Sequence, residues 1–168
     1  MSVSFTGEYP QRVDGKGRVS IPAQIRRVLD AGDAARPDAT LPRFQLAYGQ
    51  HLTNHLRIYT IKTFDALKAR IEAAQDGSPE RRHLAYVYLA QTTEIELDKD
   101  GRIVLPARQR DKLGIDEGDV MFMGFGTYCE LWKAETFAGS NGKAVDDWLA
   151  AGGPNFDPIS ILGPLGSG

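Results

Sequence analysis

The chain of 168 residues is 42% hydrophobic and 25% charged and carries a formal net charge of −2, values that fit one or two small folded domains. No run of eighteen apolar residues is present to cross a membrane, and the N-terminal residues lack the basic and apolar segments of a secretory signal. The single cysteine, Cys129, excludes an internal disulfide framework. We therefore expect a cytoplasmic protein with no membrane partner.

The chain opens with a β-rich unit. A leading strand is expected over Val3–Arg12, followed by Val13–Leu29, VDGKGRVSIPAQIRRVL, in which Asp and Gly residues predict a tight turn. Branched apolar residues predict a strand over Arg18–Ile21, which ends at Pro22 because proline cannot donate a ladder hydrogen bond. Proline suits the start of a helix, so a short helix is expected over Ala23–Leu29.

A loop, two strands and two helices follow. Gly and Pro residues make Asp30–Arg43 the least regular part of the chain, and we interpret it as a loop. Strands are predicted over Phe44–Tyr48 and Leu56–Ile61. Apolar residues at helical spacing predict a helix over Phe64–Ala74, and Ser78, followed by proline and an acid, predicts the start of another. This helix, turn and helix would link two β-rich units.

The second unit repeats the first. Leu97–Leu113, LDKDGRIVLPARQRDKL, aligns with Val13–Leu29 at a constant offset of 84 positions, with seven of seventeen residues identical, and this indicates two related structural units. Gly114 is expected to cap the second helix. A turn, a strand and one helix bury too little surface alone, so each copy should be completed by the other. The identical pairs are Asp14/Asp98, Gly17/Gly101, Arg18/Arg102, Pro22/Pro106, Ala23/Ala107, Arg26/Arg110 and Leu29/Leu113.

The end of the second unit also matches the first. Strands are expected over Val120–Phe125 and Tyr128–Lys133. Leu56–Phe64 matches Cys129–Phe137 at an offset of 73, so the first unit carries about eleven extra residues. We assign them to the loop at Asp30–Arg43.

A short helix is predicted over Val145–Ala150. The residues after it, GGPNFDPISILGPLGSG, are too rich in Gly and Pro for a packed element, so a flexible tail is expected. The GPLGS stretch in this tail resembles an expression-vector scar, although its C-terminal position fits native sequence at least as well.

The charges are unevenly distributed. Arg12–Arg27 holds five basic residues against Asp14, a local balance of +4, whereas Glu135–Gly168 has a balance of −3. A basic patch therefore coincides with the first motif. Lys16 has Asp100 at its equivalent position, so the second motif is expected to have a weaker positive field and to bind phosphate less strongly.

Two stretches, GEYPQRVDGKGRVSIPAQIR and LDKDGRIVLPARQRDKLGI, the latter followed by GFGTYCELWKAETF, resemble the MraZ family of bacterial transcriptional regulators. The resemblance covers roughly Phe5–Phe137, and its most specific feature is the doubled Asp-x-x-x-Arg motif. It implies an α+β fold in which two tandem AbrB-like swapped-hairpin β units, joined by a helical hairpin, form one pseudo-symmetric domain. The implied parts are residues 3–64 (first unit), 65–91 (helical connector), 92–137 (second unit) and 138–168 (C-terminal helix and tail).

The resemblance also implies a function. Family members are expected to bind repeated boxes of double-stranded promoter DNA ahead of their own gene, which heads the division and cell-wall gene cluster, and to repress it. They are expected to do so as ring-shaped homo-oligomers. The implied protein is a cytoplasmic, nucleoid-associated regulator with no cofactor and no small-molecule substrate. The alternative is a protein-interaction or scaffolding ring that does not bind DNA.

The DNA-binding site implied by the resemblance consists of Asp14, Lys16, Arg18, Asp98 and Arg102. Arginine suits this role because its planar guanidinium donates two parallel hydrogen bonds to a phosphate or to a guanine edge. An Asp four residues earlier, across a turn, can hold that guanidinium in one orientation. The alternative reading of each motif is a turn-closing ion pair that binds no ligand.

Other reactive side chains are interpreted as structural. Arg26 and Arg110 follow the proline on each helix, and we assign them a structural or intersubunit role. The three histidines are expected on the surface, and no metal site is predicted because His51 and His55 flank a turn rather than share a helix face. Cys129 is expected to be a buried thiol. Without a phosphate loop, a nucleophile elbow or an organised acid pair, the sequence predicts no enzyme and no catalytic residue.

Overall fold

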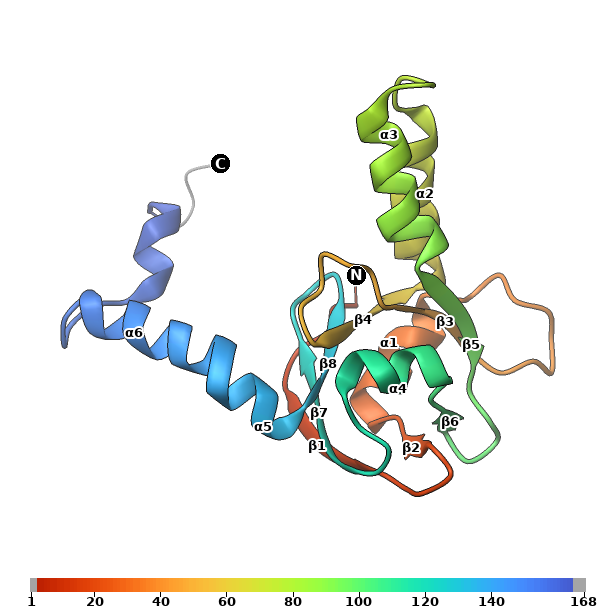
Figure 1. The fold of residues 1–168 in the computed structure, drawn as a ribbon, viewed down its shortest axis with the longest axis horizontal. Helices are drawn as coiled ribbons and strands as arrows, with labels where there is room; N and C mark the ends of the chain where they lie inside the picture. The colour runs from red at the N-terminus through yellow and green to blue at the C-terminus, as the bar shows by residue number, and fades with distance from the viewer. Residues whose placement is uncertain (1–2, 165–168) are drawn as a thin grey trace. The chain divides into compact units, whose positions relative to one another are not determined.

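The computed structural model describes residues 3–164 and divides the chain into two compact units, one ending at Ala134 and the other beginning at Glu135. The first unit is α+β, as predicted, and contains both repeats (Figure 1). Within residues 3–164, every helix is too short or too polar to traverse a lipid bilayer.

The strands of the first unit are β1 (Glu8–Val13), β2 (Arg18–Ser20), β3 (Arg43–Ala47), β4 (His55–Thr60), β5 (Thr92–Glu96), β6 (Arg102–Val104), β7 (Gly118–Gly124) and β8 (Cys129–Lys133). Its helices are α1 (Ala23–Ala31), α2 (Ile61–Ala73), α3 (Pro79–Leu84), the π-helical η1 (Ala85–Ala90) and α4 (Ala107–Leu113).

Local signals fix where the helices begin and end. The Ser78 hydroxyl accepts a hydrogen bond from the Arg81 amide at 3.1 Å, which confirms the predicted start of α3. Thr60 caps α2 in the same way, accepting from the Thr63 amide at 3.0 Å. Gly114 takes a left-handed conformation with φ of 70° and ends α4, which confirms the predicted cap.

The strands of the two repeats interlock. Six antiparallel strands form one sheet in the order β1-β7-β8-β4-β3-β5, and β2 pairs with β6 in a separate two-stranded ribbon, called the ribbon below. The repeat relates β1 to β5, β3 to β7 and β4 to β8, so the order is unchanged when the two copies are exchanged. The outer strand of each copy pairs with a strand of the other, β1 with β7 and β5 with β3. Each half is therefore completed by its partner, as the sequence predicted.

A pseudo-twofold axis passes through two cross-strand pairs. In the ribbon, Val19 lies opposite Ile103, its own counterpart at the offset of 84. In the sheet, Arg57 of β4 lies opposite Glu130 of β8, its counterpart at the offset of 73, with Arg57 Nη2 3.8 Å from Glu130 Oε2. Opposite charges at this point favour pairing of the two different halves, because two copies of one half would bring like charges together.

The eleven extra residues of the first repeat are not all in the loop after α1. The strand registers make Phe44 of β3 equivalent to Val120 of β7, an offset of 76. Eight extra residues therefore precede β3, and the other three lie in the turn between β3 and β4. This turn buries Leu52 (1% exposed) against the same apolar cluster as Ala47, whereas the shorter turn between β7 and β8 packs the partly buried Tyr128 against it. The sequence assignment of all eleven to one loop was wrong because residues 44–54 match their counterparts too weakly to align.

Strand β5 was not predicted from the sequence. Thr92–Glu96 forms an edge of the sheet, and its side chains are half-buried or exposed, so hydrophobic alternation there is weak. Ile95 alone packs against the core. The repeat itself carries the missing signal, because β5 lies 84 positions after the leading strand β1.

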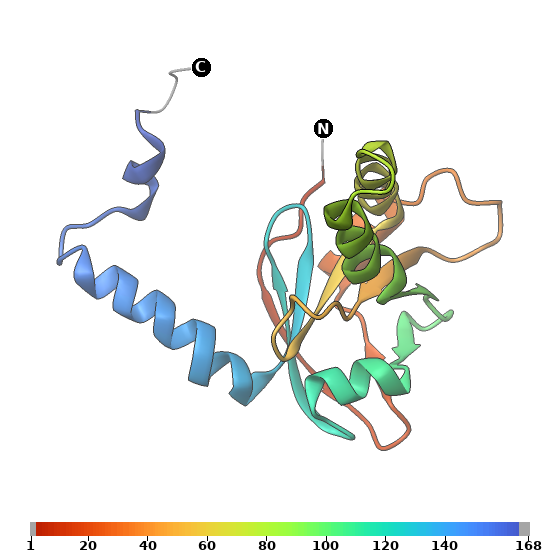
Figure 2. The ribbon, with the colours of Figure 1, turned by 45° about the horizontal axis from the view of Figure 1, so that its top comes forward.

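Two apolar clusters hold the first unit together. The main cluster lies between the sheet, the ribbon and helices α1 and α4, and it includes the inner face of the ribbon, Val19 and Ile103. The second lies where α2 meets the sheet, around Tyr59 and Phe64. Helices α2 and α3 form a hairpin that projects from the sheet and away from the ribbon (Figure 1, Figure 2). The ribbon is therefore presented on a surface of its own.

The second unit is built from short helices. The predicted helix at Val145–Ala150 is confirmed as part of α6. In the segment expected to be an unpacked tail, η3 forms because Asp157 followed by proline is itself a helix start, and the Asp157 carboxylate accepts from the Ile159 amide at 3.2 Å. Most of the GPLGS stretch lies outside the described residues. The elements of this unit are α5 (Ala134–Phe137), the π-helical η2 (Ala138–Gly142), α6 (Lys143–Ala151) and the 3-10 helix η3 (Pro158–Leu162).

A buried ion pair fastens the long loop to β3. Asp33, only 3% exposed, accepts hydrogen bonds from the Arg43 amide at 3.0 Å and from Arg43 Nε and Nη2 at 3.1 and 2.9 Å. The guanidinium, and after it the amide, hold the pKa of Asp33 below its usual value. The stability that the pair contributes is therefore present above the ordinary carboxyl pKa and is lost as the pH falls through the lowered one.

Replacing the buried acid tests this pair. Asp33→Asn should lower the free energy of unfolding by about 2 kcal/mol at neutral pH, because three hydrogen bonds lose a charged acceptor while Arg43 stays partly solvated. The deficit should begin to shrink below about pH 4, the ordinary carboxyl pKa, and should be lost as the pH falls through the lowered pKa of Asp33, where the parent loses the same charge. Asp38→Asn, on the exposed part of the same loop, is the control and should unfold like the parent. Equal denaturant midpoints for both variants would contradict the assignment.

Candidate nucleic-acid interface

The first motif forms a turn that is closed around one carboxylate. Asp14 Oδ1 accepts the backbone amides of Lys16 and Arg18, both at 2.9 Å, and Oδ2 accepts Arg18 Nε at 2.7 Å. The Asp14 amide donates to the Arg18 carbonyl at 3.0 Å, and Gly17 allows the turn with a φ of 80°. The Arg18 amide, and then its guanidinium, lower the pKa of Asp14 to about 2. The carboxylate therefore stays charged at any physiological pH and fixes the Nε edge of Arg18.

The second motif forms the same turn with a looser arginine. Asp98 Oδ1 accepts the amides of Asp100 and Arg102 at 2.8 and 2.9 Å, and these bonds, the Arg102 amide first, lower the pKa of Asp98. Arg102 Nε is 3.4 Å from Asp98 Oδ2, compared with 2.7 Å for the Arg18 pair. Asp100, the counterpart of Lys16, also accepts from Arg102 Nη2 at 3.3 Å. The guanidinium of Arg102 is thus shared between two acids.

The two turns hold each other in place. The Leu105 amide donates to the Gly17 carbonyl at 2.8 Å, and the Ile21 amide donates to the Gly101 carbonyl at 2.9 Å. Each turn therefore receives a hydrogen bond from the strand of the other copy. The two motifs come together at one ribbon, as the resemblance implied.

Arg26 and Arg110 cover the opposite turns. A Cβ added to Gly17 would lie 3.1 Å from Nη1 of Arg110. A Cβ added to Gly101 would overlap the guanidinium of Arg26 in the same way. A larger residue at either glycine would displace the arginine that packs on it. The structural role expected of both arginines fits this position, which lies between the repeats of one chain.

One face of the ribbon is directed outward. The middle pair, Val19 and Ile103, is buried, so strand alternation places the flanking residues on the other side. In register, Arg18 lies opposite Val104 and Ser20 lies opposite Arg102. We call these four residues the ribbon face: Arg18, Ser20, Arg102 and Val104. Ser20 and Val104 are members that the motif did not indicate, although alternation along each three-residue strand does.

The basic charges are shared between the two turns. Helix α1 leads away from its own motif, so Arg26 and Arg27 line a cavity of about 370 Å³ together with Asp98 and Lys99 of the second turn. Arg12 was also counted with the first motif, but its Nη1 lies 3.6 Å from Oδ1 of Asp119 on β7. Arg110 of α4 lies over the first turn in the same way, so charge crosses in both directions and the weaker positive field expected at the second motif stays a prediction. The sequence count attributes to the first turn charges that the fold carries to the second.

His55 and Cys129 lie outside the ribbon face, and the prediction from the sequence is wrong for His55 and confirmed for Cys129. His55 was expected on the surface, but it is 8% exposed and stacks on Trp132 with 4.2 Å between the ring centroids. Its Nε2 is 3.5 Å from Glu130 Oε2, so burial and an acid partner explain the error. Cys129 is fully buried, as predicted, and burial raises the pKa of its thiol to about 12. In residues 3–164, no group of three or more His, Cys, Asp or Glu side chains is placed to hold a metal ion.

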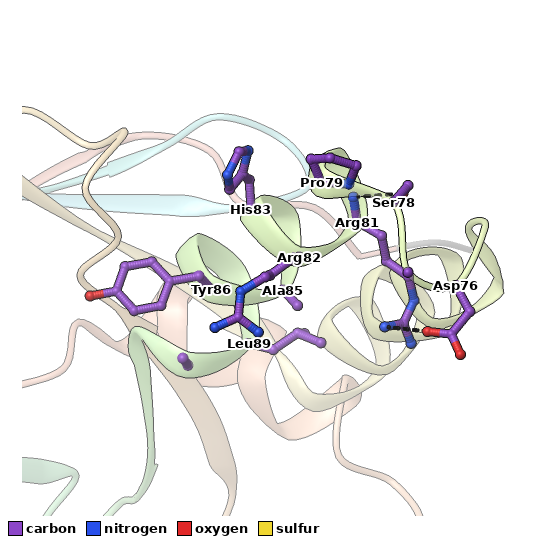
Figure 3. A pocket seen from close by; sticks show the side chains of 11 residues that line it. Asp76, Ser78, Pro79, Arg81, Arg82, His83, Ala85, Tyr86 and Leu89 are labelled. Carbon is purple, nitrogen blue, oxygen red and sulfur yellow. Dashed lines mark hydrogen bonds and ion pairs between the residues drawn. The ribbon is translucent and has the colours of Figure 1, made fainter.

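A second hollow lies on the helical hairpin (Figure 3). It has a volume of about 980 Å³ and is lined by Arg81, Arg82, Tyr86 and Leu89, among others. Arg81 is engaged by Asp76 at 3.4 Å. The lining has no Asp-x-x-x-Arg turn and comes from one helical hairpin alone. The ribbon face, which both repeats build, is the stronger candidate for recognition of nucleic acid.

Known proteins are similar in sequence to this chain over almost its full length. The family model described as "MraZ protein, putative antitoxin-like" matches residues 88–142. The transcriptional regulator MraZ of Ruegeria pomeroyi is 36% identical over 166 residues, which cover 99% of each chain. That of Cereibacter sphaeroides is 37% identical over 172 aligned positions, again covering 99% of each chain. The chain belongs to the MraZ family.

The relationship covers both motifs. The segment matched by the MraZ model contains the second turn, β6 and α4, and the longer alignments contain the first turn as well. A more distant MraZ protein, from Desulfitobacterium hafniense, is 31% identical over 147 residues, which cover 88% of this chain and 93% of the relative. Family membership therefore applies to the whole first unit, including both sides of the ribbon.

Proposed function

We propose that this chain is a sequence-specific, DNA-binding transcriptional regulator that places the ribbon face in the major groove of double-stranded DNA. The ribbon face is the observation that carries the proposal. A two-stranded ribbon fits the width of the major groove, and arginine is the side chain that most often reads guanine there. The names of the MraZ relatives support a regulator of transcription, and no enzymatic role is proposed.

Each motif arginine is held in one orientation by its aspartate, and this supports a role in contacting base edges. Asp14 occupies the Nε of Arg18, which leaves both terminal nitrogens free to donate in parallel to a guanine edge. Because the guanidinium is already oriented, less side-chain freedom is lost on binding. A turn-closing ion pair alone would not require the arginine to stand on the outward side of the ribbon.

Three cations near the turns support contacts with phosphate. Lys16, Arg27 and Lys99 are exposed, and none has an ion-pair partner within residues 3–164. Cations that flank a groove-reading element are suited to the phosphate backbone, which positions the protein without reading sequence. The competing function, a scaffolding ring without DNA binding, gives these side chains no role.

The finer details of the proposal rest on the family resemblance. We propose that the DNA is a set of repeated boxes in the promoter of the chain's own gene, at the head of the division and cell-wall cluster. The protein would repress this promoter as a ring-shaped homo-oligomer in the cytoplasm, associated with the nucleoid. No cofactor is part of the proposal.

Removal of the arginines tests the site. Arg18→Ala and Arg102→Ala should each weaken binding to promoter DNA by about 1–3 kcal/mol, because each loses contacts with base edges. Arg70→Ala, an exposed arginine on α2, is the matched control and should bind like the parent. Fluorescence anisotropy at one fixed salt concentration gives the comparison. A folded Arg18→Ala, Arg102→Ala double variant that binds as tightly as the parent would rule out the ribbon face.

Exchange of the charge between the two turns tests how each arginine is presented. Lys16→Asp should place an acid beside Arg18, as Asp100 is placed beside Arg102, and should weaken binding. Asp100→Lys should release Arg102 Nη2 and add a cation, so binding should tighten and its dependence on salt should steepen by about one phosphate contact. Titrations at two salt concentrations measure both quantities. Equal affinities and slopes for the parent and both variants would mean that the asymmetry has no role in binding.

Self-association should appear as a dependence on the number of boxes. If subunits join, every second contact becomes intramolecular, so DNA with several boxes should bind far more tightly than DNA with one. Light scattering should show an oligomer at the concentrations used. A monomer with equal affinity for one box and for several would contradict this part of the proposal.

A further inference from the structure

Val104 is an apolar side chain held outward on the ribbon face. It is 58% exposed, although its neighbours Ile103 and Leu105 are 4% and 0% exposed. Successive side chains of a strand point to opposite faces, and Ile103 and Leu105 on either side of Val104 both face the core. Val104 must therefore face outward, just before α4 begins after Pro106. Exposed, Val104 contributes little to folding through burial.

The repeat shows that the strand does not require valine here. The counterpart of Val104 at the offset of 84 is Ser20, which is exposed at the equivalent end of β2. Strand propensity favours a branched residue at both positions equally. The ribbon face therefore has one polar corner, beside Arg102, and one apolar corner, beside Arg18.

The register places Val104 level with Arg18. The two residues lie directly opposite each other in the antiparallel pair, so their Cβ atoms are about 5 Å apart. Successive base pairs are about 3.4 Å apart along the helix axis. A guanidinium and a valine side by side on the ribbon can therefore contact the same base pair or neighbouring ones.

The major groove offers one apolar group, the C5-methyl of thymine. We propose that Val104 reads a thymine methyl within one base pair of the guanine contacted by Arg18, and that it makes the two ends of the ribbon differ in specificity. This inference rests on the proposed function. Ser20, which has only a hydroxyl to offer beside Arg102, gives no such preference for a methyl group.

Replacing thymine by deoxyuridine removes the methyl group and leaves base pairing unchanged. The probe is a duplex that the parent protein selects from a random-sequence library, with each thymine replaced in turn. At one position the replacement should weaken binding by the parent about fourfold, the value of one buried methyl group. This position should adjoin the base pair at which Arg18→Ala loses its preference for guanine.

Two variants assign the effect to a side chain. Val104→Ser makes this corner of the ribbon face like that of Ser20, and it should bind the thymine and deoxyuridine duplexes equally. Ser20→Ala, the matched control, should keep the fourfold difference. Thermal unfolding of each variant confirms that it is folded, which the exposure of both side chains favours.

The outcomes separate this inference from the proposed function. If the parent selects no DNA sequence, both fail. If it binds a selected duplex and no replacement has an effect, or if Val104→Ser keeps the fourfold difference, the assignment of Val104 is overturned while the regulator stands. Loss of the difference in Val104→Ser alone supports the inference.

Discussion

Two reciprocal hydrogen bonds, from the Leu105 amide to the Gly17 carbonyl and from the Ile21 amide to the Gly101 carbonyl, join the turns on which the ribbon depends. Neither motif is complete without them, because each strand is only three residues long and obtains its pairing from the other copy. The middle of the ribbon is anchored in the main apolar cluster by Val19. The spacing of the two outward arginines is therefore set by the fold before any ligand arrives, and preorganisation of this kind lowers the free energy lost on binding.

The same constraint explains how a nearly symmetric frame supports an asymmetric surface. At the pseudo-twofold axis, Arg57 faces Glu130, so the two halves select each other rather than a second copy of themselves. Once that pairing is fixed, residues on the outward side are free to differ without cost to the core. Asp100 accepts from Arg102 Nη2, whereas the equivalent position beside Arg18 is a lysine, and Val104 stands where the related corner has a hydroxyl. An asymmetric surface can distinguish the two directions along a DNA box.

Much of this arrangement could be predicted from the sequence because it is local or repeated. The turn around Asp14 follows from Asp and Gly spacing, and the repeat predicted that each copy would complete the other. Tertiary contacts decided the rest. His55 is buried because Trp132 and Glu130 reach it from a strand more than seventy residues away, which no local pattern records. Arg26 belongs in sequence to the first motif but packs on the second turn, because α1 crosses to the other copy. Charge counted along the chain therefore assigns Arg26 to the wrong turn.

The central claim is that the ribbon face meets DNA, and photo-crosslinking tests it most directly. Cys129 is buried with a pKa raised to about 12, so a thiol-reactive crosslinker can be attached to a single introduced cysteine. A crosslinker at Ser20→Cys should form a covalent adduct with promoter DNA on illumination, and excess unlabelled promoter DNA should abolish it. The same label at His83→Cys, on the helical hairpin, should give little adduct. Efficient crosslinking from position 83 with none from position 20 would contradict the account.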